Sequence, residues 1–416
     1  MAYLRVVGRK PLRGACRVPA AKNAVLPILA ASTLIRGKVT LVGCPRLADV
    51  DAMLTILADL GASTSQTGDV IEVDCTGIDK TACVSPLTGC MRSSLFLLGS
   101  MAGRMGEVSL GTVGGCVIGA RPVDIHVEGL RRLGAEVEEK EDRLYVRRRE
   151  GGASTYRLPF PSVGATVNLA CYALSKRDTT VLDNVAVEPE VVDLVDFLRA
   201  AGADVSLCGR RLLIEGGKPL CGLTYRPIGD RIVAATVLIA TAMTGGEVTV
   251  TGVSYEPLSA LLYKLKNSSC IARVSCDTIH LCAKERPRSF SLSTGVYPDF
   301  ATDMQSLALA YDATARGVAL VRERVFENRF ALAAELGKMG ADISVFGDTA
   351  RVVGRRLHGA DTSCCDLRAG AALVCAALAA DGISTINHIG LIDRGYQHIE
   401  RTFAALGADI TRIDER

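Results

Sequence analysis

One cysteine stands in a glycine-rich stretch whose residue types suit proton transfer or nucleophilic chemistry. The stretch reads Gly114-Gly115-Cys116-Val117-Ile118-Gly119-Ala120-Arg121-Pro122-Val123-Asp124. Its glycines permit unusual backbone angles, and Pro122 followed by Asp124 is typical of a helix start, so we expect a loop that runs into a helix. Arg121 and the helix N-terminus would lower the pKa of the Cys116 thiol and make its thiolate available. The alternative is an ordinary buried thiol in a glycine-rich connection, and the residues alone leave it open.

Basic residues at expected helix starts form a second candidate set. Lys22 and Asn23 come directly before an apolar helix and pair a cation with an amide, a combination that suits an anion. Four arginines stand at similar entrances, namely Arg92, Arg121, Arg368 and Arg394. Guanidinium groups that converge would bind a substrate that carries both carboxylate and phosphate. Taken singly, a solvated surface lysine and surface arginine ion pairs remain the alternatives.

Asp303 is the candidate general base. It lies in Pro298-Asp299-Phe300-Ala301-Thr302-Asp303-Met304-Gln305, a break in the surrounding apolar pattern. The alternative is that Asp303 or Thr302 only caps a helix that begins at Met304.

The elements that must position these residues recur along the chain. The recurring unit is an apolar helix, a glycine turn, a short strand, an amphipathic helix and a second strand after Leu-Gly-Ala or a similar turn. The first copy spans 26–64, and later copies close at 133–135, 201–203, 339–341 and 406–408. A degenerate copy over 234–274 has Lys266-Asn267-Ser268-Ser269 in place of the glycine turn. Six copies follow, long enough for a βαβαββ-like unit, and their nearly all-apolar first helices favour compact domains over an open solenoid.

Composition excludes several classes of protein. The chain has 416 residues, of which 49% are hydrophobic and 22% charged, enough for two α/β domains. Its apolar runs are too short for a membrane span, and the N-terminus has no apolar export segment, so we expect a cytoplasmic protein. The 15 cysteines are scattered without CxxC spacing or a histidine cluster, so we expect reduced thiols and no metal. A net charge of +3 without tryptophan gives no sign of a nucleic-acid surface.

Two crossings between the halves are predicted. Gly216-Gly217-Lys218-Pro219 through Pro227-Ile228-Gly229 has the punctuation of a linker, and the strand Tyr3 to Val7 has no partner before the first repeat. If that strand pairs in the other half, a second crossing lies near Ala20-Ala21. We therefore expect one domain over 22–229 and a second over 1–21 and 230–416, joined by a two-strand hinge beside a ligand cleft.

Several motifs in the same order as in one family carry a resemblance through nearly the whole chain. They are Lys22-Asn23, the stretch Gly114 to Asp124, SVGAT from Ser162, TDMQ from Thr302, FENRF from Phe326, DLRA from Asp366 and IDRGY from Ile392. Together they resemble the UDP-N-acetylglucosamine 1-carboxyvinyltransferase family of enolpyruvyl transferases. The resemblance implies a two-domain inside-out α/β barrel with three units in each domain, which agrees with the repeat count.

The resemblance also implies a reaction. The family transfers the enolpyruvyl group of phosphoenolpyruvate to the 3′-hydroxyl of UDP-N-acetylglucosamine and releases phosphate through a tetrahedral intermediate, at the start of peptidoglycan precursor synthesis. It needs neither a metal nor an organic cofactor, and its loop cysteine is the target of fosfomycin. We expect these two small-molecule substrates as the partners and a monomeric enzyme.

Residue roles come from the same resemblance. Cys116 corresponds to the general acid and Asp303 to the candidate base at the sugar hydroxyl. Lys22, Arg92, Arg121 and Arg394 correspond to cations that contact phosphoenolpyruvate. The remaining correspondences are substrate contacts, most of them to the UDP-sugar: Asn23, Pro122, Val123, Asp124, Ser162, Val163, Gly164, Val325, Arg329 and Arg368. Because the arginines and Lys22 hold down the pKa of Asp303, we expect it to orient the hydroxyl more than deprotonate it.

Two rivals remain. The sister transferase for shikimate 3-phosphate shares the fold and phosphoenolpyruvate, but its NAGTA-type loop is missing and a loop cysteine is present. A regulatory protein that binds the UDP-sugar without turnover is the other rival, although it would have little need for the acid Cys116.

Overall fold

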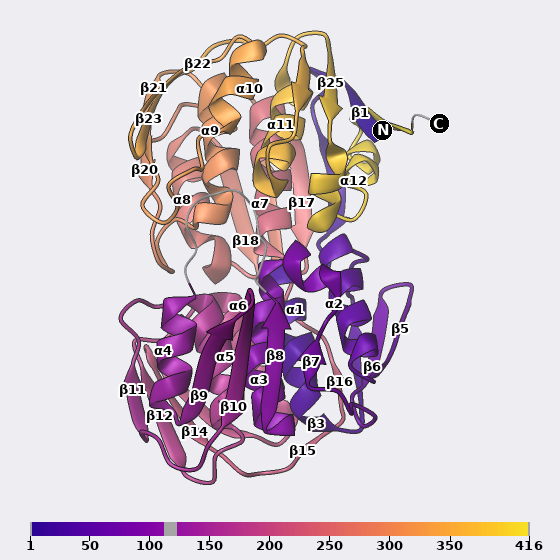
Figure 1. The fold of residues 1–416 in the computed structure, drawn as a ribbon. Coiled ribbons are helices and arrows are strands. Elements are labelled where there is room, and N and C mark those ends of the chain that lie inside the picture. Colours follow the sequence, from indigo (N-terminus) through magenta and orange to yellow (C-terminus); the bar gives the residue numbers. More distant parts are fainter. Residues whose placement is uncertain (1, 112–122, 415–416) are drawn as a thin grey trace. The chain divides into compact units, whose positions relative to one another are not determined.

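The computed structural model describes residues 2–111 and 123–414 of the chain. These residues form two compact units (Figure 1). Unit 1 holds residues 2–19 and 229–414, and unit 2 holds residues 20–111 and 123–228. Each unit has its own continuous hydrophobic core, so each is described by itself.

Unit 2 contains three four-stranded sheets and six α-helices among its described residues. The first sheet has the order β16 (Thr224–Tyr225), β4 (Lys38–Val42), β6 (Val70–Asp74), β5 (Ser63–Thr67). The second has the order β7 (Ala82–Cys83), β8 (Glu107–Gly111), β10 (Arg143–Arg148), β9 (Ala135–Lys140). The third has the order β11 (Thr155–Arg157), β12 (Thr179–Asp183), β14 (Arg211–Glu215), β13 (Asp204–Cys208). A further parallel pair joins β3 (Ile35–Arg36) to β15 (Leu220–Cys221). The helices are α1 (Lys22–Ala31), α2 (Ala48–Asp59), α3 (Phe96–Met105), α4 (Asp124–Arg132), α5 (Val163–Ala173) and α6 (Pro189–Ala200).

Unit 1 likewise contains three four-stranded sheets and six α-helices among its described residues. Its sheets have the orders β18 (Ile271–Ser275), β19 (Thr278–Cys282), β17 (Glu247–Thr251), β2 (Arg13–Arg17); β20 (Leu292–Ser293), β21 (Val318–Arg322), β23 (Thr349–Val353), β22 (Asp342–Phe346); and β24 (Asp361–Ser363), β25 (Ile383–Asn387), β1 (Ala2–Val7), β26 (Asp409–Asp414). Its helices are α7 (Arg231–Thr244), α8 (Ser259–Asn267), α9 (Gln305–Thr314), α10 (Leu332–Lys338), α11 (Leu367–Ala379) and α12 (Ile399–Ala405). Short 3-10 turns precede or follow helices in both units: η1 (Ser32–Leu34), η2 (Pro86–Cys90), η3 (Arg92–Leu95), η4 (Glu256–Leu258), η5 (Thr302–Met304) and η6 (Ile389–Arg394).

All six four-stranded sheets in the described part of the chain share one pairing pattern. An edge strand pairs in parallel with its neighbour, as β7 does with β8, and the other two pairs are antiparallel, as in β8, β10 and β9. A parallel pair cannot be closed by a tight turn and needs a long connection, which the helices supply. The mixed α/β architecture predicted from the sequence is therefore confirmed.

In both units, the apolar helix that begins each sequence repeat lies in the hydrophobic core of its unit. In α11, every residue from Leu367 to Leu378 is buried, because the helix is apolar on all sides beyond Arg368 in its first turn. In unit 1, α7, α9 and α11 pack on one another, and in unit 2, α3 packs against both α1 and α5. The contact between α3 and α5 is so close that a Cβ at Gly99 would lie 2.0 Å from the backbone oxygen of Asn168. The Asn168 side chain accepts a hydrogen bond from the Gly99 amide at 2.7 Å, which locks this contact.

The turn residues explain the degenerate fourth copy. In five copies a glycine takes the left-handed conformation after the amphipathic helix: Gly61, Gly134, Gly202, Gly340 and Gly407, with φ between 87° and 108°. In the fourth copy Ser269 takes that place with φ of 75°. The fold therefore keeps the turn at the cost of a strained backbone at a residue with a Cβ.

The N-terminal strand pairs as the sequence predicted. Strand β1 lies between β25 and β26 and pairs antiparallel with both, so it belongs to the same unit as the C-terminus. Where the described chain passes between the units, at 19–20 and 228–229, backbone hydrogen bonds tie the two segments together within each unit. The Ala21 amide donates to the Ile228 oxygen at 2.7 Å in unit 2, and the Asp230 amide donates to the Pro19 oxygen at 2.9 Å in unit 1.

Two further observations concern the cysteines and the helix lengths of the described residues. Every described cysteine is a free thiol, and most are buried. Among the helices that the structure describes, none is long and apolar enough to cross a membrane.

Candidate active site

Asp303 lies at the centre of a charged cluster in unit 1. It belongs to η5, directly before α9. Its Oδ1 accepts a hydrogen bond from Arg329 Nη2 at 3.0 Å, and its Oδ2 accepts two from Arg368, from Nη2 at 2.8 Å and Nε at 3.2 Å. The arginine side chains are only 3% and 6% exposed, whereas the Asp303 side chain is 26% exposed. Two buried cations thus hold a carboxylate that still reaches the surface of its unit.

The electrostatics of the cluster fix the charge of Asp303. Burial opposes ionisation of this carboxyl, but the guanidinium groups of Arg368 and Arg329 outweigh it and hold the pKa of Asp303 well below its usual range. In return, burial disfavours the charge of Arg368, while Asp303 raises the pKa of that guanidinium above its ordinary value. Asp303 is therefore an ionised hydrogen-bond acceptor at neutral pH and a weak base.

The alternative of a simple helix cap at Asp303 is wrong. Neither Asp303 nor Thr302 caps α9, whose first residue is Gln305. The Thr302 hydroxyl instead donates to Glu323 Oε2 at 3.0 Å. Asp303 is thus free of a capping role.

Arg368 is held by a genuine helix cap. The Asp366 side chain accepts hydrogen bonds from the amides of Arg368 at 2.7 Å and Ala369 at 2.8 Å, and so begins α11. Asp230 caps α7 in the same way and accepts bonds from the amides of Ile232 and Val233. The predicted helix entrance at Arg368 is confirmed, and since its side chain is buried, a surface ion pair is excluded for it.

Arg329 and Val325 lie on the segment between β21 and α10. The Arg329 guanidinium carbon lies 5.2 Å from the ring centroid of Phe326, a cation–π contact. The amides of Val325 and Phe326 donate to Glu323 Oε1 at 2.8 and 3.1 Å. This segment therefore has a defined path that presents Arg329 to Asp303.

Arg394 ends η6 and is half-buried, so it does not open a helix as the sequence suggested. Two residues on, the buried Tyr396 forms a hydroxyl hydrogen bond of 2.8 Å with Thr236 of α7. This bond anchors the segment that carries Arg394 to the core of unit 1.

In unit 2, Lys22 is the first residue of α1 and pairs with Asp49 of α2. Its Nζ lies 2.8 Å from Asp49 Oδ2, and the two side chains are 11% and 9% exposed. The alternative of a solvated surface lysine is therefore wrong. Asn23 follows in the first turn and is half-buried.

A second group in unit 2 gathers at the starts of α4 and α5. Ser162 caps α5, because its hydroxyl oxygen accepts a hydrogen bond from the Ala165 amide at 3.3 Å. At Gly164 an added Cβ would lie 2.9 Å from the ring of His126 in α4, so only glycine fits this close approach. The His126 ring is fixed by Asn168 at 2.7 Å. The turn of Ser162, Val163 and Gly164 thus lies against the helix that begins at Asp124.

The remaining predicted residues are placed as follows. Asp124 is the exposed first residue of α4, as predicted, and Val123 directly precedes it. Arg92 begins η3, which leads into α3 and contacts both α1 and α5. Cys116, Arg121 and Pro122 lie outside the described residues.

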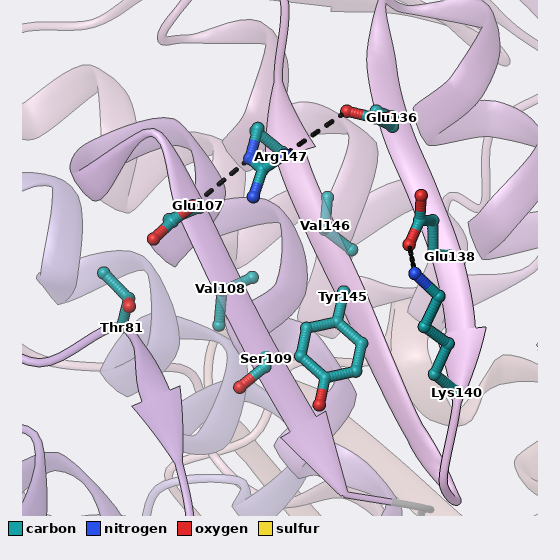
Figure 2. Close-up of a pocket in the computed structure, with 10 residues that line it drawn as sticks. All are labelled: Thr81, Glu107, Val108, Ser109, Glu136, Glu138, Lys140, Tyr145, Val146 and Arg147. Carbon is teal, nitrogen blue, oxygen red and sulfur yellow. Dashed lines mark hydrogen bonds and ion pairs between the residues drawn. The ribbon is translucent and has the colours of Figure 1, made fainter.

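A cavity of about 380 Å³ lies elsewhere on unit 2, over β8, β9 and β10 (Figure 2). In it, Arg147 lies between Glu107 and Glu136, at 3.3 and 3.7 Å, and Lys140 pairs with Glu138. Its cations are already matched by carboxylates, so it offers no excess positive charge to an anionic substrate. None of the predicted site residues lines it.

Sequence reasoning missed two acidic residues that contact predicted site residues, one in each unit. Asp49 pairs with Lys22, and Glu323 binds Thr302 and the Val325–Phe326 backbone. Neither stands in a motif with a spacing that indicates its partner. Among the described residues, no group of side chains could hold a metal ion.

Comparison with known proteins identifies the family to which the chain is related. The family described as "EPSP synthase (3-phosphoshikimate 1-carboxyvinyltransferase)" matches residues 6–403. Relatives that match from end to end carry a different name. The UDP-N-acetylglucosamine 1-carboxyvinyltransferase of Dichelobacter nodosus is 40% identical over 418 residues, with all of both chains covered. The protein of that name from Thermus thermophilus is 42% identical over 408 residues, covering 98% of this chain and 96% of the relative.

The chain belongs to the UDP-N-acetylglucosamine 1-carboxyvinyltransferase family.

Solved structures agree with this family at the level of the fold. The enolpyruvyl transferase NikO from Streptomyces tendae superposes with a TM-score of 0.89, with 23% identity over 100% of this chain and 99% of that chain. An EPSP synthase from Acinetobacter baumannii gives a TM-score of 0.74 with 17% identity over 99% of this chain and 100% of that chain. The resemblance to the UDP-N-acetylglucosamine 1-carboxyvinyltransferase family and the enolpyruvyl transferase fold, both expected from the motifs, are confirmed.

Proposed function

We propose that this chain transfers the enolpyruvyl group of phosphoenolpyruvate to the 3′-hydroxyl of UDP-N-acetylglucosamine and releases phosphate. The observation that carries the proposal is the end-to-end identity of 40 to 42% with relatives named for this activity. The reaction opens peptidoglycan precursor synthesis. We place it in the cytoplasm and expect a monomer, which light scattering on the purified protein would test.

The reaction runs by addition and elimination. In the addition, the sugar hydroxyl oxygen bonds to C2 of phosphoenolpyruvate, the hydroxyl loses its proton, and C3 gains a proton to become a methyl group. In the elimination, the methyl group loses a proton, the C2–C3 double bond forms again, and the C2–O bond to phosphate breaks. The chain must therefore supply an acid for carbon, an acceptor at the hydroxyl and cations for the phosphate and carboxylate.

Asp303 is assigned to the sugar hydroxyl. Its carboxylate stays ionised because two buried guanidinium groups hold it in that form. It can accept a hydrogen bond from the 3′-hydroxyl and orient the attacking oxygen, a contribution that depends on position more than on basicity.

The other roles follow the motif correspondence. Cys116 donates the proton to C3, and the cations Lys22, Arg92, Arg121 and Arg394 contact phosphoenolpyruvate. The start of α1 at Lys22 adds the positive end of a helix dipole to the charge of the lysine. The turn at Ser162 to Gly164, together with Asn23, Val123, Asp124 and Val325, contacts the UDP-sugar. We further propose that the paired crossings at 19–20 and 228–229 act as a hinge.

Phosphate release with each substrate alone and with both together tests this function. Release that requires phosphoenolpyruvate and UDP-N-acetylglucosamine is expected, and Cys116→Ala should abolish it. Release with shikimate 3-phosphate in place of the sugar nucleotide would assign the chain to the sister activity. Binding of UDP-N-acetylglucosamine without any release by the folded protein would favour the regulatory rival.

A further inference from the structure

We propose that Glu323 is a positioning residue for the sugar nucleotide. It holds the turn that carries Asp303 and the backbone at Val325 in fixed positions relative to each other. This inference rests on the proposed function. Glu323 directly follows β21 and is only 3% exposed. A buried carboxylate is costly unless its oxygens are satisfied, so its contacts show what the fold retains it for.

The contacts of Glu323 reach two separate segments. Its Oε2 accepts from the hydroxyl of Thr302, the residue before Asp303 in η5, at 3.0 Å. Its Oε1 accepts from the amides of Val325 at 2.8 Å and Phe326 at 3.1 Å. One side chain therefore joins the turn that carries Asp303 to the segment that carries Val325.

A second chain of contacts links Glu323 to the carboxylate of Asp303. Phe326, whose amide Glu323 binds, lies under the guanidinium of Arg329 at 5.2 Å. Arg329 in turn donates to Asp303 Oδ1 at 3.0 Å, and its own Nε has no partner within the described residues. The Arg329 side chain thus depends on Phe326 and Asp303 for its position. Glu323 binds the Phe326 amide directly, and it binds Thr302, the residue next to Asp303.

The three donors that hydrogen-bond to the Glu323 side chain are all neutral. A hydroxyl and two backbone amides orient the carboxylate but do not neutralise its charge. Glu323 therefore acts as a three-point clamp on these groups rather than as an ion-pair partner. Both positions that it clamps are assigned to the sugar nucleotide, and the three donors to its carboxylate come from Thr302, Val325 and Phe326 rather than from residues assigned to phosphoenolpyruvate. Loss of the clamp should therefore affect one substrate and spare the other.

Steady-state kinetics of Glu323→Ala, measured by phosphate release, tests the inference. We expect KM for UDP-N-acetylglucosamine to rise at least about tenfold, about 1.4 kcal/mol of lost binding, with a fall in kcat. KM for phosphoenolpyruvate should stay within about twofold. Glu323→Gln should recover most of the loss, because its carbonyl can accept from both amides while the Thr302 hydroxyl accepts from its amide group.

Two further variants keep the test decisive. Thr302→Val removes only the hydroxyl arm, so it should raise the same KM by a smaller factor, and it decides the matter where Glu323→Ala fails to fold. Glu247→Gln, in the exposed β17 pair with His280, is the matched control and should leave both KM values unchanged. A parallel rise of both KM values, or wild-type KM values in folded Glu323→Ala and Thr302→Val, overturns the inference. Wild-type protein that releases no phosphate overturns the proposed function instead, and calorimetric titration of UDP-N-acetylglucosamine into the variants then still tests the clamp.

Discussion

Replacing Asp303 with asparagine should destabilise unit 1 as well as abolish activity. The variant keeps the shape of the side chain but removes the charge shared by Arg329 and Arg368, whose side chains are 3% and 6% exposed. The asparagine oxygen can accept from one guanidinium, while its amide hydrogens face the other donor. Two buried cations then lose the counter-charge that made their burial acceptable.

The magnitude follows from burial. Breaking a buried ion pair by removing one partner costs about 3–5 kcal/mol, and the 26% exposure of Asp303 reduces this to about 2–3 kcal/mol because water screens part of the interaction. For a unit of this size, each kcal/mol shifts the unfolding temperature by about 2–4 °C. We therefore expect the transition of unit 1 to fall by roughly 4–12 °C in differential scanning calorimetry.

The pH dependence supplies a second check. The folded-state pKa of Asp303 lies below the unfolded value of about 3.9, so its stabilisation is fully present above that value and is lost as pH falls toward the folded pKa. The difference between wild type and Asp303→Asn should be constant from about pH 5 to 9 and shrink only below about pH 4.

A matched surface pair serves as the control. Asp348 lies 2.8 Å from Arg322 in the same unit, but these side chains are 48% and 56% exposed. Asp348→Asn should leave the unfolding temperature of unit 1 nearly unchanged, because solvent and salt screen an exposed pair. Equal shifts of the unfolding temperature for the two variants, or an Asp303→Asn effect that disappears between pH 5 and 9, would show that the buried pair does not stabilise unit 1.

Three other predictions rest on the same structure. Burial raises the pKa of Asp193 to about 6, so unit 2 should lose up to about 3 kcal/mol of stability as pH rises from 4 to 6. In denaturant titrations, Asp193→Asn should remove most of this dependence of the unfolding free energy on pH. Lys22→Met leaves Asp49 buried without its lysine and should cost about 3 kcal/mol, whereas Lys22→Met with Asp49→Leu should recover part of that stability in chemical unfolding without recovering activity. Ser269→Gly should stabilise unit 1 by about 1 kcal/mol, seen as a higher unfolding midpoint, because glycine takes a φ of 75° without strain; an unchanged or lower midpoint would contradict this.

The sequence predicted the elements of this fold better than the contacts between them. The apolar helices, the glycine turns and the pairing of Tyr3 to Val7 with the C-terminal half were predictable, because they depend on local periodicity and on which strands lacked partners. Ser269 shows the limit of such patterns, since the fold keeps the left-handed turn where the glycine signal is absent.

For the candidate site residues too, the motifs predicted the residues better than the contacts between them. The motifs indicated Asp303, Arg329 and Arg368, and the structure joins them over 65 residues of sequence. The partner of Lys22 was not predictable, because Asp49 reaches it only through the packing of α2 against α1. Glu323 was missed because nothing in a single acidic residue after a strand shows which amides it will accept from.

Phosphate release from phosphoenolpyruvate, measured with and without UDP-N-acetylglucosamine, is the direct test of the proposed reaction. We expect release only when both substrates are present, and none from folded Cys116→Ala under the same conditions. Release that does not depend on the sugar nucleotide, or wild-type rates from Cys116→Ala, would contradict it.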